Sequence, residues 1–216
     1  MGEVVSTGSA GSGADDVVAC TAKDPRSAAK SDTMVPAVAF VGKQNSGKTT
    51  LLEKVIAELV ARGLNVGTLK HHSHVGFDMD IEGKDSWRHR KAGSTFTAVA
   101  SPDQLGIVRA LDRELDPEEV LAAMGALDAQ GAGKLDIILV EGYRQSGLPT
   151  IELFRSGNPK DADRPVGGEG NRIVAVVTDI PRVVGEAQAQ DISVFSFESI
   201  SQLALFIERE ILAIIP

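Results

Sequence analysis

The chain has 216 residues, of which 43% are hydrophobic, and a formal net charge of -8; this is enough for one domain with a full core. The acidic balance argues against nonspecific binding of nucleic acid, and no apolar run reaches the roughly 18 residues that a membrane span needs. We therefore expect neither nucleic acid nor membrane as a partner. The single cysteine, Cys20, excludes an intramolecular disulfide and fits a cytoplasmic location.

Residues 1–33 are rich in Gly, Ser, Ala and Asp and have no apolar periodicity. This composition predicts a disordered N-terminal extension. There is no basic start followed by an apolar run, so we do not interpret the segment as a secretory signal. The folded domain is predicted to cover residues 34–216.

The start of this domain reads as strand, loop, helix, strand. Residues 37–42 form a short apolar run, and residues 64–70 form another. Between them, apolar residues recur at helical spacing up to Gly63, which we expect to end the helix; they are Leu52, Val55, Ile56, Leu59 and Val60. The pattern predicts a βαβ unit with two parallel strands.

The remaining segments continue this alternation. Helices are predicted at 83–93, 101–111, 116–129 and 198–212, and strands at 95–100, 135–143, 149–155, 172–179 and 192–197. The polar residues 156–171 are expected to form a long mobile loop. Because each strand is nearly all apolar, we predict an α/β fold with a mostly parallel central sheet and helices on both faces.

A phosphate-binding motif connects the first strand to the first helix. Residues 42–49 fit G-x-x-x-x-G-K-[ST], and the strand before and the helix after are the context that the motif requires. Glycines let the backbone N–H groups surround phosphate oxygens, Lys48 would reach the β- and γ-phosphates, and the Thr49 hydroxyl would bind Mg²⁺. The expected nucleotide-binding residues are Gly42, Lys43, Asn45, Ser46, Gly47, Lys48, Thr49 and Thr50.

Two carboxylates are candidates for a Mg²⁺-positioning acid. Asp136 precedes the apolar strand of residues 137–140, and Glu141 follows it. Ligands of parallel α/β sheets bind beyond the carboxyl ends of the strands, so we assign Glu141 to Mg²⁺, directly or through water. Lys48 and Glu141 are then the candidate catalytic residues.

Thr178 and Asp179 end a later apolar strand and are candidates for reading the base. A carboxylate can accept the N1–H and N2–H of guanine, a donor pair that adenine lacks. The full Asn-Lys-x-Asp pattern of GTPases is missing, and Asp179 could instead cap a turn before Pro181. We favour guanine.

All four histidines lie in residues 70–93, together with interleaved acids and bases. The segment could be a transition-metal site, a second anion pocket or a solvated loop. We favour the anion pocket, with Asp78 or Asp80 adding to the Mg²⁺ ligands. Its residues would face a second ligand or a partner; they are Lys70, His71, His72, His74, Lys84, Asp85, Arg88 and Arg90.

Three stretches in this order resemble the MobB family of molybdopterin-guanine dinucleotide biosynthesis proteins: FVGKQNSGKTTLLEKVIAELVARG, TLKHHSH…FDMDIEGKDSWRHRKAGS and DIILVEGY. The resemblance implies a P-loop NTPase that forms a homodimer, binds GTP with Mg²⁺ and hydrolyses it weakly. It also implies an adapter role for MobA, the enzyme that attaches GMP to molybdopterin. Residues 70–90 would then face the pterin phosphate or the partner enzyme.

Two other functions share the phosphate loop. One is a small-molecule kinase or ATP-dependent ligase, with residues 156–171 as a substrate lid. The other is a metallochaperone GTPase that uses the histidines.

Lys43 stands where some relatives of the dimeric class carry a lysine that reaches the other subunit's nucleotide. Those loops continue with Gly-Gly, whereas this one has Gln44 and Asn45, so we interpret the Lys43 side chain as solvated.

Overall fold

The computed structural model describes residues 35–72, 74, 76–128, 133–167 and 171–212. The extension predicted for residues 1–33, with Cys20, lies outside the described residues. Among those described, no helix has the length and apolar character to cross a membrane. The elements are β1 (Ala37–Gly42), α1 (Lys48–Ala61), β2 (Val66–Lys70), α2 (Asp85–Lys91), β3 (Phe96–Ala100), β4 (Leu105–Arg109), α3 (Pro117–Asp128), β5 (Ile137–Glu141), β6 (Pro149–Phe154), β7 (Arg172–Thr178), α4 (Pro181–Gln188), β8 (Ser193–Phe195), α5 (Ile200–Ile207) and a π-helical turn, η2 (Glu208–Leu212).

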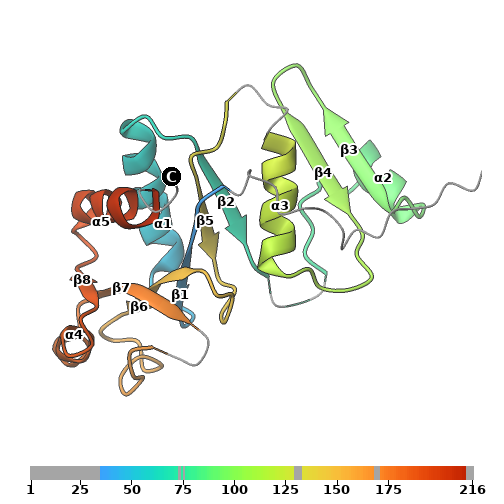
Figure 1. Ribbon diagram of the computed structural model, residues 1–216. Coiled ribbons are helices and arrows are strands. Elements are labelled where there is room, and N and C mark those ends of the chain that lie inside the picture. Colours follow the sequence, from blue (N-terminus) through green and yellow to red (C-terminus); the bar gives the residue numbers. More distant parts are fainter. Residues whose placement is uncertain (1–34, 73, 75, 129–132, 168–170, 213–216) are drawn as a thin grey trace, which may run out of the picture. The chain divides into compact units, whose positions relative to one another are not determined.

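A six-stranded sheet in the order β2-β5-β1-β6-β7-β8 forms the centre of the fold (Figure 1). Every pairing within this sheet is parallel. Since β1 lies between β5 and β6, the loop that follows β1 emerges beside the carboxyl ends of both neighbours. The prediction of a mostly parallel sheet is therefore confirmed.

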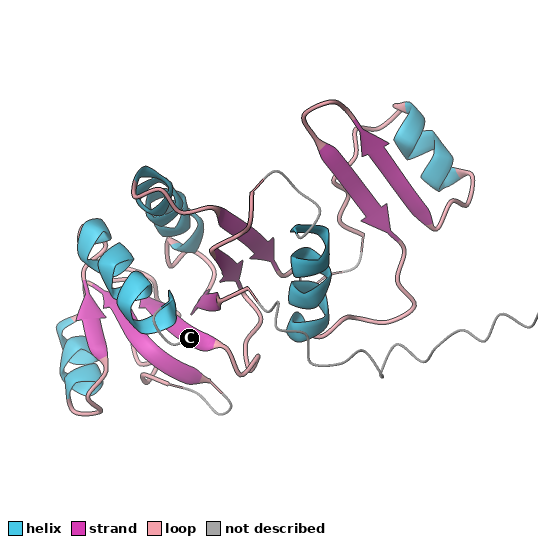
Figure 2. Ribbon diagram, turned by 45° about the horizontal axis from the view of Figure 1, so that its top comes forward, coloured by secondary structure: helices cyan, strands magenta, loops and turns pink. Residues whose placement is uncertain are grey.

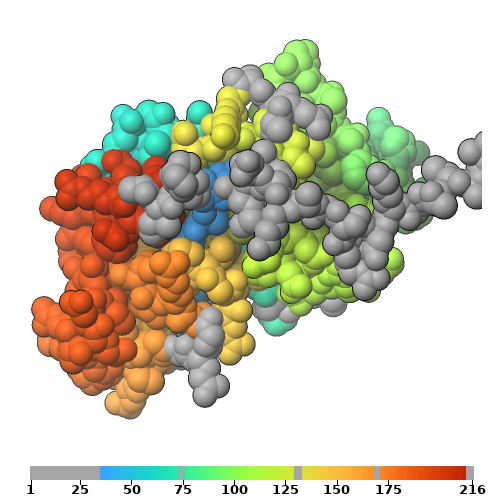
Figure 3. All heavy atoms as spheres, viewed as in Figure 1, coloured from blue at the N-terminus to red at the C-terminus, as the bar shows by residue number. Residues whose placement is uncertain are grey.

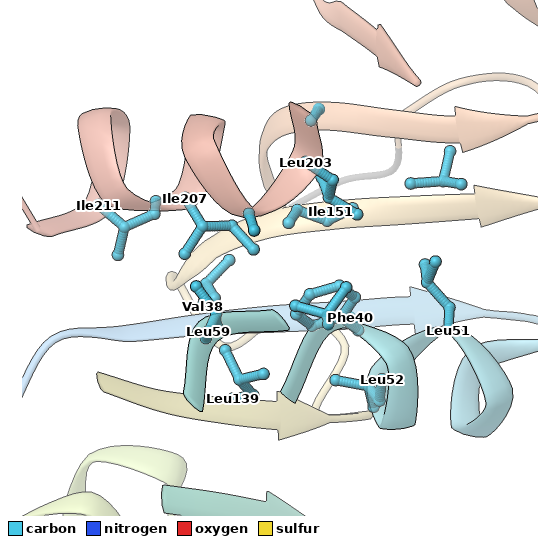
Figure 4. Close-up of a cluster of buried hydrophobic side chains, with 14 of the residues drawn as sticks. Val38, Phe40, Leu51, Leu52, Leu59, Leu139, Ile151, Leu203, Ile207 and Ile211 are labelled. Atoms are coloured by element: carbon cyan, nitrogen blue, oxygen red, sulfur yellow. The ribbon is translucent and has the colours of Figure 1, made fainter. Parts of the chain in front are cut away.

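Helices α1 and α5 cover one face of this sheet. Their apolar side chains pack on alternate residues of β1, β5 and β6 in one buried cluster, and Figure 4 shows Val38, Phe40, Leu139 and Ile151 of the strands within it. The atoms of α5, in red, lie against those of α1, in teal, in Figure 3. The helix α1 ends at Ala61 with Arg62 as its C-cap, and Gly63 follows with a φ of 90°, the left-handed conformation expected of a C′ glycine.

Two other helices cover the opposite face. Leu121 of α3 packs against β1 and β5, and Val183 of α4 packs against residues of β6 and β7. Because the strands are buried on both faces, they read as nearly continuous apolar runs. Helices on both faces were predicted, and the fold confirms them.

The segment 101–111, predicted as helical, instead contains β4. This strand pairs antiparallel with β3 as a separate two-stranded sheet, and α2 lies beside it (Figure 2). Gly106 disfavours a helix interior, and the β-branched Ile107 and Val108 favour a strand. The helix prediction for 101–111 was wrong because pairing with β3, a contact between separate segments, decides the conformation.

Candidate functional site

The loop between β1 and α1 curls through two residues in the left-handed region. Asn45 has a φ of 67° and Gly47 a φ of 82°. Gly47 is also the N-cap of α1, and no described side chain caps this helix end. The first N–H groups of a helix lack helical partners and attract anions. The loop therefore has the backbone form that the motif predicts for a phosphate-binding site.

The Lys48 ammonium folds back onto this loop. Its Nζ donates hydrogen bonds to the carbonyl oxygens of Gly42 at 2.9 Å and Lys43 at 2.8 Å. Burial lowers the pKa of Lys48; the nearby Glu141 acts to raise it and the nearby Arg144 acts to lower it. Phosphate oxygens bind an ammonium more strongly than neutral carbonyls do. An anion entering the loop would therefore draw Lys48 away from the two carbonyls.

The loop also holds a buried hydroxyl with no protein partner. Ser46 is fully buried, and its Oγ has no hydrogen bond among the described residues. A Cβ atom at Gly42 would lie 2.6 Å from this Oγ and 3.1 Å from the carbonyl oxygen of Leu153, so only glycine fits there. An unpaired buried polar group costs about 1–3 kcal/mol. A ligand with acceptor oxygens fits this donor.

Thr49 and Glu141, the two predicted metal-binding residues, come together from separate elements. The Thr49 Oγ1 donates to the Glu141 carboxylate at 3.3 Å, and Lys70 Nζ lies 3.5 Å from the same carboxylate. Asp136 lies at the opposite end of β5, where it accepts the backbone N–H of Asn65 at 2.7 Å. Hydroxyl and carboxylate oxygens are the ligands that Mg²⁺ prefers, so Thr49 and Glu141 fit a magnesium ion.

A cleft of about 320 Å³ lies at the carboxyl end of β7. The loop after β6 and the turn before α4 form its walls, with Ser156, Asn158 and Asp179 among the polar residues. The Asn158 side chain donates to the carbonyl oxygen of Gln44 at 3.1 Å. This bond joins the cleft to the phosphate loop, so the two lie next to each other.

Asp179 lines this cleft with both carboxylate oxygens engaged. Ser156 donates its backbone N–H to Oδ1 at 2.6 Å and its hydroxyl to Oδ2 at 2.7 Å. Partial burial acts to raise the pKa of Asp179, but the Ser156 hydrogen bonds and the charge of Arg155 outweigh it and lower the pKa. The turn before Pro181 is capped by Thr178 Oγ1, which accepts the Ile180 N–H at 3.0 Å. Asp179 is therefore not the cap considered above.

The described part of the loop predicted to be mobile is held by a buried ion network. The Arg164 guanidinium binds Glu152 of β6 and, at 2.9 Å, Asp161 of the loop itself. Asp161 also accepts the Asn158 side chain at 2.9 Å. Sequence reasoning missed this network. The one signal for it in the sequence is Glu152, a single acid in an otherwise apolar strand, which indicates a buried carboxylate that needs a cation.

His71 lies at the carboxyl end of β2, beside the loop that follows β5. Its Nε2 is 2.7 Å from a carboxylate oxygen of Glu114, and its ring stacks on Tyr143 with centroids 4.3 Å apart. These three residues line a cavity of about 630 Å³ that also includes Arg144 and Asp116. Sequence reasoning singled out His71 but not the other residues of this cavity.

Two pairs of residues contact each other within the histidine segment. Arg90 forms an ion pair with Asp78 at 2.7 Å, and the Ser86 hydroxyl donates to Asp80 at 2.9 Å. In the described structure, Asp80 makes no hydrogen bond with Thr49 or Glu141.

The other predicted partner-facing residues of the segment are exposed; they are His72, His74, Lys84, Asp85 and Arg88. His72 Nδ1 lies 2.8 Å from the carbonyl oxygen of His74. No group of three or more His, Cys, Asp or Glu side chains gathers for a metal anywhere in the described ranges. The described residues of the segment therefore do not form a metal site with three ligands already in place.

The family profile described as "MobB: Molybdopterin guanine dinucleotide synthesis protein B" matches residues 37–179. The chain belongs to the MobB family. This match includes the phosphate loop, Glu141, the histidine segment and Asp179. It supports neither the metabolite kinase nor the metallochaperone considered from the phosphate loop alone.

Known MobB proteins align with most of the chain. The molybdopterin-guanine dinucleotide biosynthesis adapter protein of Escherichia coli (strain K12) is 40% identical over 149 residues, or 69% of this chain and 81% of that protein. The Haemophilus influenzae adapter protein is 33% identical over 179 residues, or 82% of this chain and 90% of that protein.

Solved MobB structures share the fold. The crystal structure of Bacillus subtilis MobB superposes with a TM-score of 0.63 at 26% identity, covering 82% of this chain and 98% of that one. The MobB homologue of Bacillus stearothermophilus gives a TM-score of 0.54 at 27% identity, covering 81% of this chain and 96% of that one. The central sheet thus belongs to a P-loop NTPase fold, as predicted.

Proposed function

We propose that this protein is a GTP-binding adapter with weak GTPase activity in molybdopterin-guanine dinucleotide biosynthesis. Membership of the MobB family supports the adapter role. The observation that carries nucleotide binding is the meeting of Thr49 and Glu141 beside the phosphate loop. The loop supplies N–H groups, Lys48 and Ser46 for phosphate, and Thr49 and Glu141 would hold Mg²⁺.

We propose guanine as the base that binds in the cleft of about 320 Å³ at the carboxyl end of β7. Ser156 presents two donors to the two oxygens of Asp179, and guanine offers the same pattern with its N1–H and N2–H. Asn158 connects this cleft to the phosphate loop. One nucleotide could thus place its base at Asp179 and its phosphates at Lys48.

The partners we propose are a MobA-type guanylyltransferase, a molybdopterin-type phosphate ligand and a second copy of the chain, acting in the cytoplasm. Lys70 ends β2 and His71 follows it; both would face the pterin ligand or the enzyme. The β3–β4 sheet carries exposed apolar side chains, including Phe96 at 54% and Leu105 at 60% exposure. Such a short sheet with apolar exposed residues is a surface that a second copy would cover.

Isothermal titration calorimetry tests the nucleotide assignment. We expect Mg-GTP to bind more tightly than Mg-ATP, and Lys48→Ala to abolish binding, because the motif lysine contacts the phosphates. Lys54→Ala is the matched control, because Lys54 lies on α1 with its ammonium 3.9 Å from Glu198. Equal binding by wild type and Lys48→Ala would overturn the phosphate site, and tighter binding of ATP would overturn the guanine assignment.

A guanylyltransferase assay tests the adapter role. Adding the protein with GTP and Mg²⁺ to a MobA-type enzyme should increase the formation of molybdopterin-guanine dinucleotide. Lys48→Ala should remove this increase, while Lys54→Ala should retain it. An identical yield with and without the protein would contradict the adapter role.

A further inference from the structure

The loop that follows Glu141 has an unusual backbone. Gly142, Tyr143 and Gln145 have φ values of 97°, 51° and 62°. A left-handed conformation is unfavourable for residues with a side chain, and such residues gather at functional sites when the surroundings hold them in place. Tyr143 and Gln145 therefore mark this loop as constrained.

Contacts from three separate parts of the chain hold the loop in this form. Gly142 N–H donates to the carbonyl oxygen of Phe40 in β1 at 3.1 Å. The Tyr143 hydroxyl donates to the carbonyl oxygen of Leu115 at 3.4 Å, and Gln145 N–H donates to Asn171 Oδ1 at 2.9 Å.

The same loop packs closely against the end of β2. A Cβ atom at Gly142 would lie 3.1 Å from the Cβ of His71. The positive φ and this close approach together require glycine at position 142. Arg144 is thus carried on a loop that is anchored on both sides of it.

Arg144 has no role in the site described so far. It is exposed and makes no hydrogen bond or ion pair with the part of the chain that the structure describes. It stands three residues after Glu141, whose carboxylate lies 3.3 Å from the Thr49 hydroxyl beside the phosphate loop. The Gly142 N–H that binds the Phe40 carbonyl of β1 fixes the start of its loop at the same end of the sheet.

We propose that Arg144 binds the terminal phosphate of the nucleotide held by the phosphate loop. This inference rests on the proposed GTP-binding function. The terminal phosphate lies between the motif lysine and the metal-binding acid in P-loop proteins, and Arg144 follows that acid, Glu141, by three residues. A guanidinium binds phosphate through two parallel hydrogen bonds. Arg144 would thus distinguish a triphosphate from a diphosphate.

This contact would connect the nucleotide to the cavity of about 630 Å³, because Arg144, Tyr143 and His71 all line it. Tyr143 stacks on His71, and it is the direct neighbour of Arg144. A shift of Arg144 onto the terminal phosphate would therefore move a wall of the cavity. Triphosphate and diphosphate states would present different surfaces there.

Calorimetric titration with a nonhydrolysable GTP analogue and with GDP, both with Mg²⁺, tests the proposal. Arg144→Ala should weaken binding of the analogue about tenfold or more, the effect of losing a charged hydrogen-bond partner, and change GDP binding less than about twofold. Arg144→Lys should retain part of the preference for triphosphate because it keeps the charge. Arg209→Ala is the matched control, because Arg209 is exposed in η2.

The outcomes separate this inference from the proposed function. GDP binding shows that each variant is folded. Unchanged binding of the analogue by Arg144→Ala, or equal losses for the analogue and GDP, would overturn the role of Arg144 and leave the GTP site intact. A wild-type protein that binds neither guanine nucleotide would overturn the proposed function, and this inference with it.

Discussion

At the scale of single residues, Asp179 is the most informative position for ligand choice. Ser156 donates to both of its carboxylate oxygens, so a base at Asp179 would have to displace Ser156 or use the remaining lone pairs of these oxygens. Guanine has a donor pair that matches a carboxylate, and adenine has not. The proposal that Asp179 reads guanine is therefore open to a direct test.

Replacing Asp179 by Asn should change the preferred base. An asparagine side chain offers one acceptor and one donor in place of two acceptors, so guanine loses one of its two bonds. Xanthine has a carbonyl where guanine has an amino group and matches the new pattern. We expect Asp179→Asn to bind XTP more tightly than GTP in competition with a fluorescent nucleotide. Retained preference for GTP would show that Asp179 does not read the base.

At the scale of elements, the start of α3 depends on Glu119. Its carboxylate accepts the Asp116 N–H at 2.9 Å and binds Arg113 at 2.5 Å. Arg113 and, to a lesser degree, that N–H lower the pKa of Glu119 from 4.5 to about 2. A lowered folded-state pKa means that the contribution to stability is present above about pH 4.5 and is lost as the pH falls through about 2.

Nuclear magnetic resonance should therefore find the Glu119 carboxyl titrating near pH 2. Glu119→Gln should lower the melting temperature at pH 7, because it removes the charge that Arg113 binds. Glu118→Gln, one position earlier in α3, is the matched control and should leave the melting temperature unchanged. A Glu119 midpoint near the ordinary value of 4.5 would contradict the prediction.

The loop between β6 and β7 depends on Arg164. Glu152 and Asp161 are 4% and 0% exposed, so Arg164→Ala would leave two buried carboxylates without their cation. Removing one partner of a buried ion pair typically costs about 3–5 kcal/mol, and we expect a loss of this size in the free energy of unfolding measured with urea. Arg155→Ala removes a partly exposed pair with Asp179 and should cost about 1 kcal/mol or less.

These elements also show which features can be predicted from sequence. The phosphate loop and Glu141 follow from local rules: a motif in its strand–helix context, and the end of a strand at which parallel sheets bind ligands. The strand β4 and the Arg164 network could not be predicted, because each depends on contacts between distant segments. The strand β4 forms because β3 pairs with it. The Arg164 network forms because charged residues of a polar stretch are buried in the fold.

At the scale of the whole molecule, the β3–β4 sheet is the surface through which we propose that two copies associate. Its exposed apolar residues include Phe96, Val99 and Leu105, at 54%, 55% and 60% exposure. A charge introduced into an apolar interface is unpaired and desolvated when the interface closes. Leu105→Asp should therefore prevent association while leaving the monomer folded, because this side chain contributes little to the monomer's core.

Light scattering during size-exclusion chromatography measures this association. The wild type should elute as a dimer, and Leu105→Asp as a monomer with an unchanged melting temperature at low protein concentration. Val60→Asp is the matched control, because Val60 is 54% exposed on α1, outside the β3–β4 sheet. If Leu105→Asp remains dimeric, the copies associate through another surface; if Val60→Asp becomes monomeric as well, that surface includes α1.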